Sequence, residues 1–304
     1  MIETIPTSLA GERLDRVVAM LTGCSRAQAA ELIAAGSVLL DGVVARGKDK
    51  VDEGQVVDVA QTPDVGPVLP EAQADIVVPV VYADEHLIVI NKPAGLVVHP
   101  AHGHDNGTVV NGLLAMFPEL ADVGSPQRPG IVHRLDSGTT GLLVVARRQD
   151  AYESLTAQLA GRTMTRTYLA LVWGWFEHRS GTIDAPIGRD PKKPLRRGIV
   201  PDGKPARTGY DVVETFSHPA EVSSLRCKLE TGRTHQIRVH LEAVGHPVIG
   251  DPVYRNRRRR QEILADRPLL HAAELAMQHP ATGELIAFSA PLPFDMQTVM
   301  MSLS

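Results

Sequence analysis

The sequence predicts an α+β protein with a small N-terminal domain and a larger domain built around a largely antiparallel or mixed β-sheet. Three observations support this. Residues 12–60 combine helical spacings with short strands, residues 63–79 are rich in proline, and residues 80–304 alternate apolar strand-like runs with short helical segments. With 304 residues, the chain is long enough for two domains that each bury a core.

The N-terminal part reads as a compact α/β module. A first helix is predicted from four apolar residues at helical spacing, and it should end at Gly23. These residues are Leu14, Val17, Val18 and Leu21. A second helix is predicted over 25–36, and Asp41-Gly42 is a typical hairpin turn between two short strands. A further strand should follow the turn at Glu53-Gly54.

This module resembles the S4 RNA-binding domain. The matching segments are RLD at 13–15, SRAQAAELIAAGSVLLDG at 25–42 and EGQVVDV at 53–59. The resemblance implies an RNA-binding domain over residues 1–62. Residues 63–79 hold four prolines and neither lysine nor arginine, so we expect an extended linker there and a second domain over 80–304.

Strands and helices are predicted throughout the second domain. Two strands flank a polar turn in 80–93, a helix begins near Thr108, and a helix spans 151–160. Further strands are expected over 141–147, 167–176 and 224–230, and an amphipathic helix over 234–245. A largely antiparallel sheet flanked by helices and loops accommodates this order.

The charge distribution is uneven although the net charge is only −4. Seven Lys/Arg and three acidic residues lie from Arg189 to Asp211, and 255–260 reads RNRRRR. Such runs are either solvated loops or nucleic-acid contacts. The N-terminus lacks the features of a signal peptide, and no apolar run reaches membrane-spanning length. We therefore expect a cytoplasmic protein that does not enter a membrane.

Several common catalytic motifs are missing. The chain has no GxxxxGK[ST] phosphate loop, no GxGxxG after a strand and no GxSxG elbow. His99, His102 and His104 lie close together, but without HExxH or a cysteine pair a surface loop is a better interpretation than a metal site. We expect no cofactor and no bound metal.

Three segments place unusual polar residues beside apolar runs. In 128–147, Asp136 is either a turn aspartate or a catalytic group. In 161–174, Tyr168 opens an apolar strand and belongs either to the core or to a site. Residues 229–254 crowd four basic side chains into eight positions, on a basic surface helix or on one wall of a cleft. The four are Arg233, His235, Arg238 and His240.

Together these segments resemble the RluA/RluD family of pseudouridine synthases. The matching blocks occur in the order typical of the family, and the S4-like module in front of them favours the RluD branch. The blocks are KPAGLVVHP at 92–100, GIVHRLDxxTxGLLVVA at 130–146, TGRTHQIRVH at 231–240 and GHPVIGDPVY at 245–254.

The resemblance implies roles for individual residues. Asp136 matches the nucleophilic aspartate, and Tyr168 matches the tyrosine that stacks on uracil and is a candidate general base. Arg233 matches the arginine that pairs with the aspartate carboxylate. Arg134 matches the residue that takes the place of the target uridine in the RNA stack, and Ile237 matches an apolar pocket residue.

Two positions depart from the family pattern. Ser137-Gly138 stands where Lys-Asp is frequent, which weakens a phosphate contact. Arg166 stands where a lysine often precedes the tyrosine by two residues, so the charge is kept. Outside the family blocks, the arginines of the RNRRRR run are expected to bind RNA. They are Arg257, Arg258, Arg259 and Arg260.

The implied reaction converts uridine to pseudouridine within RNA. The N1–C1′ bond breaks, the base turns, and it is rejoined to the ribose through C5. A stacked base must first flip out, and a carboxylate can stabilise or trap the cleaved intermediate. Because net bond energy barely changes, no ATP, metal or redox carrier is needed. We expect 23S rRNA as the partner, with tRNA as the alternative, and a monomeric enzyme.

Two other functions stay open at this level. A non-catalytic RNA-binding factor for ribosome assembly would not need Asp136, Tyr168 and Arg233 together. A glycosidase would also use a carboxylate, but it would release free uracil.

Overall fold

The computed structural model describes residues 1–304 except 23, 25, 61–68, 101–105, 191–192 and 256–262. The chain forms two compact units, Met1–Val68 and Leu69–Ser304. Each unit has its own hydrophobic core, so each is described by itself.

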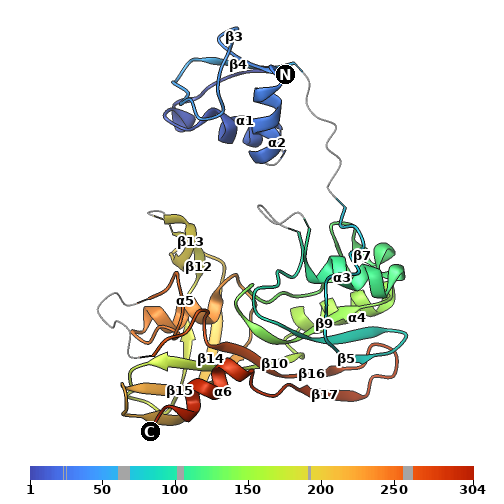
Figure 1. Ribbon diagram of the computed structural model, residues 1–304, viewed down its shortest axis with the longest axis vertical. Helices are drawn as coiled ribbons and strands as arrows, with labels where there is room; N and C mark the ends of the chain where they lie inside the picture. The colour runs from blue at the N-terminus through green and yellow to red at the C-terminus, as the bar shows by residue number, and fades with distance from the viewer. Residues whose placement is uncertain (23, 25, 61–68, 101–105, 191–192, 256–262) are drawn as a thin grey trace. The chain divides into compact units, whose positions relative to one another are not determined.

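The first unit packs two helices and a short 3-10 helix against a four-stranded antiparallel sheet (Figure 1). The helices are α1 (Leu14–Thr22), α2 (Arg26–Ala34) and the 3-10 helix η1 (Thr7–Leu9). In sheet order, the strands are β1 (Ile2–Thr4), β4 (Val56–Val59), β2 (Val38–Leu40) and β3 (Val43–Val44).

The predicted elements of this unit are confirmed. Leu14, Val17 and Val18 form the buried face of α1, as their helical spacing predicts. The turn between β2 and β3 places Asp41 and Gly42 at φ 51° and 77°, the left-handed region that an Asp-Gly hairpin turn uses. Helical and strand periodicity were therefore sufficient to predict this small module.

The second unit is built on a nine-stranded sheet in which every pair is antiparallel except β9 with β16. This confirms the predicted α+β fold with a largely antiparallel, mixed sheet. In order, the strands are β11 (Ser180–Asp184), β14 (Arg207–Phe216), β15 (Val222–Leu229), β10 (Thr165–Trp173), β16 (Leu270–Gln278), β9 (Thr140–Ala146), β6 (Leu87–Lys92) and β5 (Val80–Ala83), with β17 (Leu285–Ser289) also paired to β16.

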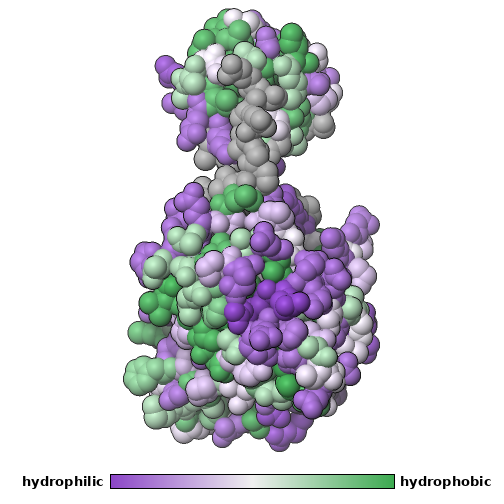
Figure 2. Space-filling view, turned by 90° about the vertical axis from the view of Figure 1, so that its right-hand side faces the viewer, coloured by the Kyte–Doolittle hydropathy of each residue, from purple (hydrophilic) through white to green (hydrophobic). Residues whose placement is uncertain are grey.

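Helices and two small hairpins surround this sheet (Figure 1). The helices are α3 (Val109–Met116), η2 (Pro118–Asp122), α4 (Gln149–Ala160), α5 (Gln236–Ala243) and α6 (Phe294–Met301). The hairpins are β7–β8 (Gly124–Ser125, Arg128–Pro129) and β12–β13 (Ile187–Asp190, Lys193–Ile199). Figure 2 shows a face of this unit on which hydrophilic side chains gather in a large patch.

Strands β6 and β9 are buried on both faces, which explains their continuous apolar sequences. Ile88 and Leu143 belong to a core cluster shared with α3 and α5. Leu87 and Leu142 belong to a second cluster shared with α4. A strand covered on both sides needs apolar residues at successive positions rather than alternating ones.

Gly141 allows the close approach of β9 to its parallel neighbour β16. Its φ is 110°, and a Cβ atom there would lie 2.2 Å from the carbonyl oxygen of Ala272. Any other residue would push the two strands apart. The pairing of β9 with β16 therefore requires the glycine that begins the GLLVVA segment.

Two expectations need correction. Residues 69–79 of the expected linker belong to the second unit: Val78 is buried, and the backbone N–H of Gln73 donates to the carbonyl oxygen of Asn111 on α3. The expected amphipathic helix over 234–245 is α5, which is buried nearly all round because its polar side chains have internal partners. No helix among the described residues is both long and apolar enough to span a membrane.

Candidate active site

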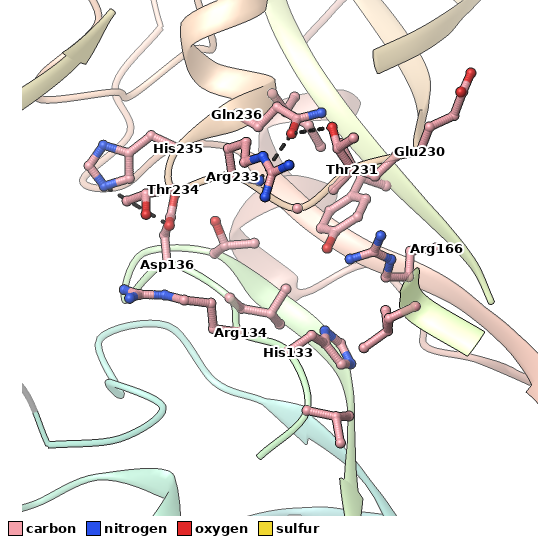
Figure 3. A pocket seen from close by; sticks show the side chains of 18 of the residues that line it. His133, Arg134, Asp136, Arg166, Glu230, Thr231, Arg233, Thr234, His235 and Gln236 are labelled. Carbon is pink, nitrogen blue, oxygen red and sulfur yellow. Dashed lines mark hydrogen bonds and ion pairs between the residues drawn. The ribbon is translucent and has the colours of Figure 1, made fainter. Parts of the chain in front are cut away.

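A cavity of about 460 Å³ brings together the three polar segments that the sequence singled out (Figure 3). Its wall is formed by the loop before β9, by β10, and by the turn from β15 into α5. All five residues predicted to act in catalysis or substrate binding line it: Arg134, Asp136, Tyr168, Arg233 and Ile237. Their proximity is a property of the fold, whereas their roles stay predictions.

The loop that carries Asp136 is fixed by its backbone carbonyl groups. The carbonyl oxygen of Asp136 accepts the N–H of Thr139 at 3.0 Å, and that of Ser137 accepts the N–H of Gly95 at 2.8 Å. Arg267 Nη1 donates to the carbonyl oxygen of Gly138 at 3.1 Å. Because one bond closes the turn and two come from distant parts of the chain, the aspartate projects from a loop that is held in place.

Lys92 at the end of β6 is a further support of this loop. Its side chain is fully buried, and Nζ donates to the carbonyl oxygens of Pro93, Leu96 and Ser137 at 2.8, 2.9 and 3.0 Å. Burial lowers the pKa of Lys92 to about 7, although the negative charge of Asp136 acts in the opposite direction. The lysine of the KPAGL segment therefore supports the loop from within rather than contacting solvent.

Arg238 on α5 pairs with the Asp136 carboxylate. Nη1 of Arg238 donates to Oδ2 of Asp136 at 2.9 Å, while Nε and Nη2 donate to the two oxygens of Asp251 at 2.6 and 3.0 Å. Burial would lower the pKa of Arg238, but the hydrogen bonds and charges of Asp251 and Asp136 raise it above its ordinary value. This guanidinium thus stays charged and bridges two carboxylates.

The predicted ion pair between Arg233 and Asp136 is wrong. Arg233 is exposed on the turn before α5, and its Nε donates to the carbonyl oxygen of Pro205 at 3.0 Å. Arg238 lies inside the helix and makes the pair instead. Its position three residues before the buried Leu241 could have indicated that it lies on the buried side of the helix.

His235 approaches the same carboxylate from the other side. It begins α5 in the left-handed conformation, with φ at 59°, and its Nε2 lies 4.0 Å from Oδ1 of Asp136. Its Nδ1 is 3.0 Å from the hydroxyl of buried Tyr254, which accepts the N–H of Arg197 on β13. Burial lowers the pKa of His235, so the ring is neutral at pH 7. A chain of contacts therefore joins the β12–β13 hairpin to the aspartate.

Tyr168, Ile237 and Arg134 differ in their exposure to the cavity. Tyr168 and Ile237 are buried, and burial raises the pKa of the Tyr168 phenol, which therefore stays protonated at neutral pH. Arg134 is exposed at the pocket wall. An aromatic face, an apolar side chain and an exposed cation are thus available around the carboxylate.

Two predicted surface features lie outside the described residues. They are the arginine run at 257–260 and the histidines at 102 and 104. His99 is described, and burial lowers its pKa. Within the described ranges, no group of three His, Cys, Asp or Glu side chains is arranged to hold a metal ion.

Comparison with known proteins identifies both units. A model described as RNA pseudouridylate synthase matches residues 86–243, and an S4 domain model matches residues 12–57. An uncharacterized RNA pseudouridine synthase of Chloroflexus aurantiacus is 49% identical over 99% of this chain and 93% of its own. Ribosomal large subunit pseudouridine synthase D of Pseudomonas aeruginosa is 44% identical over 96% of this chain and 92% of its own.

A solved structure agrees with these matches. Human RNA pseudouridylate synthase domain containing 1 covers 77% of this chain and 91% of its own, with 30% identity and a TM-score of 0.61. The resemblance that the sequence blocks indicated is confirmed. The chain belongs to the RNA pseudouridylate synthase family, the isomerases that convert uridine to pseudouridine in RNA.

Proposed function

We propose that this protein isomerises uridines of large-subunit ribosomal RNA, the 23S rRNA, to pseudouridine. The observation that carries the chemistry is the Asp136 carboxylate, fixed by Arg238 in a cavity lined by Tyr168. Several relatives that cover nearly the whole chain bear the name ribosomal large subunit pseudouridine synthase D, and this supports the choice of RNA.

Arg134 would fill the gap that the target uridine leaves in the RNA stack. The base must leave its stack to reach Asp136, at a cost of a few kcal/mol. An exposed arginine at the cavity wall can enter the gap and offset part of that cost. Within the cavity, the uracil would stack on Tyr168 beside the apolar Ile237.

Asp136 then acts on the ribose side of the target nucleotide. One carboxylate oxygen, Oδ2, is held by Arg238, so the carboxylate orientation is set before substrate arrives. The other oxygen, Oδ1, is free of the arginine and lies 4.0 Å from neutral His235. It is available to stabilise or trap the ribose when the N1–C1′ bond breaks.

Tyr168 is better suited to stacking than to proton abstraction in the free enzyme. Its pKa is raised by burial, so the phenol holds its proton at neutral pH. A phenol in that state offers an aromatic face and a hydrogen-bond donor. A general-base role would require the bound substrate to change its surroundings.

Mapping pseudouridines in 23S rRNA and tRNA from cells with and without this protein tests the proposal. Sites lost from 23S rRNA should return with the wild-type protein but not with Asp136→Asn, whose amide cannot replace a carboxylate. Loss of pseudouridine only from tRNA would contradict the 23S assignment. Release of free uracil by the purified protein would indicate a glycosidase instead.

A further inference from the structure

Arg166 on β10 is a buried cation with no partner among the described residues. It precedes Tyr168 by two positions, so both side chains lie on the same face of the strand and line the cavity. Arg166 is only 8% exposed, yet its Nε makes no hydrogen bond within the described chain, and no described carboxylate forms an ion pair with it. The equally buried Arg238 binds two carboxylates.

A second unused donor lies beside Arg166. His133 accepts the N–H of Val144 through Nε2 at 3.2 Å, and its buried Nδ1 has no partner within the described chain. Burial, helped by the charge of Arg166, lowers the pKa of His133 to about 3, so the ring is neutral and Nδ1 carries its hydrogen. Figure 3 shows both side chains on the side of the cavity away from Asp136.

These unused donors require an acceptor that comes with the substrate. A cation that is largely buried, with an Nε that has no acceptor, is unfavourable unless negative charge is placed against it. Leu159, Leu229 and Val132 are among the apolar residues that line the same cavity. A neutral N–H beside a guanidinium matches a carbonyl oxygen that gains charge during a reaction, because it adds a hydrogen bond without a second positive charge.

Tyr168 indicates which part of the substrate reaches these donors. Asp136, Tyr168 and Arg166 all line this cavity, and Arg166 lies on the same strand face as Tyr168. A uracil stacked on Tyr168 with its ribose near Asp136 would direct a carbonyl edge toward Arg166.

We propose that Arg166, assisted by His133, stabilises the negative charge that uracil carries while it is detached from the ribose. When the N1–C1′ bond breaks, its electron pair stays on the base and is shared by N1, O2 and O4. The ribose fragment is stabilised at Asp136. The C5 electron pair then forms the new bond to C1′, C5 loses its proton to a base, and N1 gains a proton, so the sequence is a balanced isomerisation.

The test compares substrates whose bases differ in their ability to carry negative charge. The full-length wild-type enzyme and its Arg166→Met variant are each given the same RNA with either uridine or 5-fluorouridine at the target position. The single-turnover rate is measured as the disappearance of the target nucleotide in its original form, in which the base is linked to the ribose through N1. Arg166→Met should slow the uridine reaction about 10²-fold, the usual loss when one donor to a developing anion is removed. The loss should be clearly smaller with 5-fluorouridine, because fluorine already stabilises the departing anion.

Three further measurements make the test decisive. Arg166→Lys keeps the charge and should recover part of the rate. Arg166→Met should keep or raise the melting temperature, because it removes an unpaired buried charge. Arg162→Met is the matched control: Arg162 lines the same cavity but is exposed and paired with Glu230, so any change it causes should be equal for both substrates.

Other outcomes would overturn the proposal. Equal losses on both substrates, with weaker RNA affinity and a smaller salt dependence, would identify Arg166 as a phosphate contact. A normal rate on uridine would show that Arg166 is not used, and a lower melting temperature would show that it has a structural partner. The proposal rests on the pseudouridylation reaction but not on the identity of the RNA, so any RNA that the wild-type enzyme modifies can be the test substrate. An error in the 23S rRNA assignment would show in the mapping of pseudouridines and would leave this test unaffected.

Discussion

Nη1 of Arg238 donates to Oδ2 of Asp136 at 2.9 Å, and this contact joins two residues 102 positions apart in the sequence. The other edge of the same guanidinium is held by Asp251, whose side chain is fully buried and also accepts two backbone N–H groups. The orientation of Asp136 thus depends on Arg238, and the orientation of Arg238 depends in turn on Asp251. Arg238 is therefore a part of the site as much as Asp136 is.

Replacing Arg238 should impair both the reaction and the fold. Arg238→Lys can reach one carboxylate but not bridge two, so the single-turnover rate should fall about 10²-fold or more. Arg238→Met leaves Asp251 as an uncompensated buried charge, so the free energy of unfolding should fall by about 3–5 kcal/mol. Urea unfolding and single-turnover rates measure the two effects.

Arg233 provides the matched control for this prediction. It is exposed, and among the described residues its side chain binds only the Pro205 carbonyl, so Arg233→Met should change the free energy of unfolding by less than about 0.5 kcal/mol. If Arg233→Met were as destabilising as Arg238→Met, the assignment of the ion pair to Arg238 would have to be withdrawn.

The confusion between these two arginines shows what a linear sequence leaves undetermined. Both lie in one basic segment, and both could face a carboxylate. Helical spacing favours Arg238 only once the start of the helix is known, and α5 begins after His235, whose backbone is left-handed, so Arg233 lies in the turn outside the helix. A single backbone angle of this kind is not encoded in periodicity, whereas the local order of the strands and helices is.

The pH dependence of stability should reveal the burial of Lys92. Its pKa is about 7 in the folded protein and near 10.5 when unfolded. Between these values the unfolded chain binds a proton that the folded protein does not, so this residue makes stability rise with pH across that window. Urea unfolding at pH 7 and 8.5 should show this contribution in the wild type but not in Lys92→Met.

The comparison with Lys92→Met isolates this contribution from other groups. Cys227, for example, has its pKa raised to about 12 by burial, and its effect is present in both proteins. An identical change in stability with pH for the two proteins would mean that Lys92 stays charged, held by its three carbonyl contacts.

Burial of Lys92 and Arg166 was not predictable from composition or spacing. Lysine and arginine are rarely buried, so their types predict exposure. The fold overrides this tendency because Lys92 ends a strand beneath the Asp136 loop, and Arg166 shares its strand face with Tyr168. In contrast, the apolar runs of β6 and β9 predicted strands correctly, and both strands are buried.

The unit Leu69–Ser304 should fold and catalyse by itself. Its two main core clusters contain no residue of Met1–Val68. Removing the S4 unit should leave the turnover of a short RNA within a few-fold of the full chain, but weaken binding to structured rRNA about 10²-fold, as expected when one of two linked binding modules is lost. Binding and single-turnover assays on both RNAs measure this, and an insoluble or inactive fragment would contradict it.

Arg134 should be distinguishable from the arginines at 257–260 by the step that each affects. The 257–260 run lies outside the described residues, so its role rests on charge: four phosphate contacts on a single strand would contribute about −2.8 to the slope of log K against log salt. Replacing all four by alanine should therefore flatten the slope and raise KM with little change in kcat, because such contacts are equal in the ground and transition states.

Arg134→Ala should instead lower kcat more than it lowers initial RNA affinity. Arg134 lies at the cavity wall, and its proposed role begins only after the uridine has left the stack. Its loss should therefore destabilise the flipped state, which a fluorescent base analogue next to the target would report as reduced unstacking. If Arg134→Ala changed only the salt slope, as the four-alanine variant should, Arg134 would be one more phosphate contact, and the role of replacing the flipped base would be wrong.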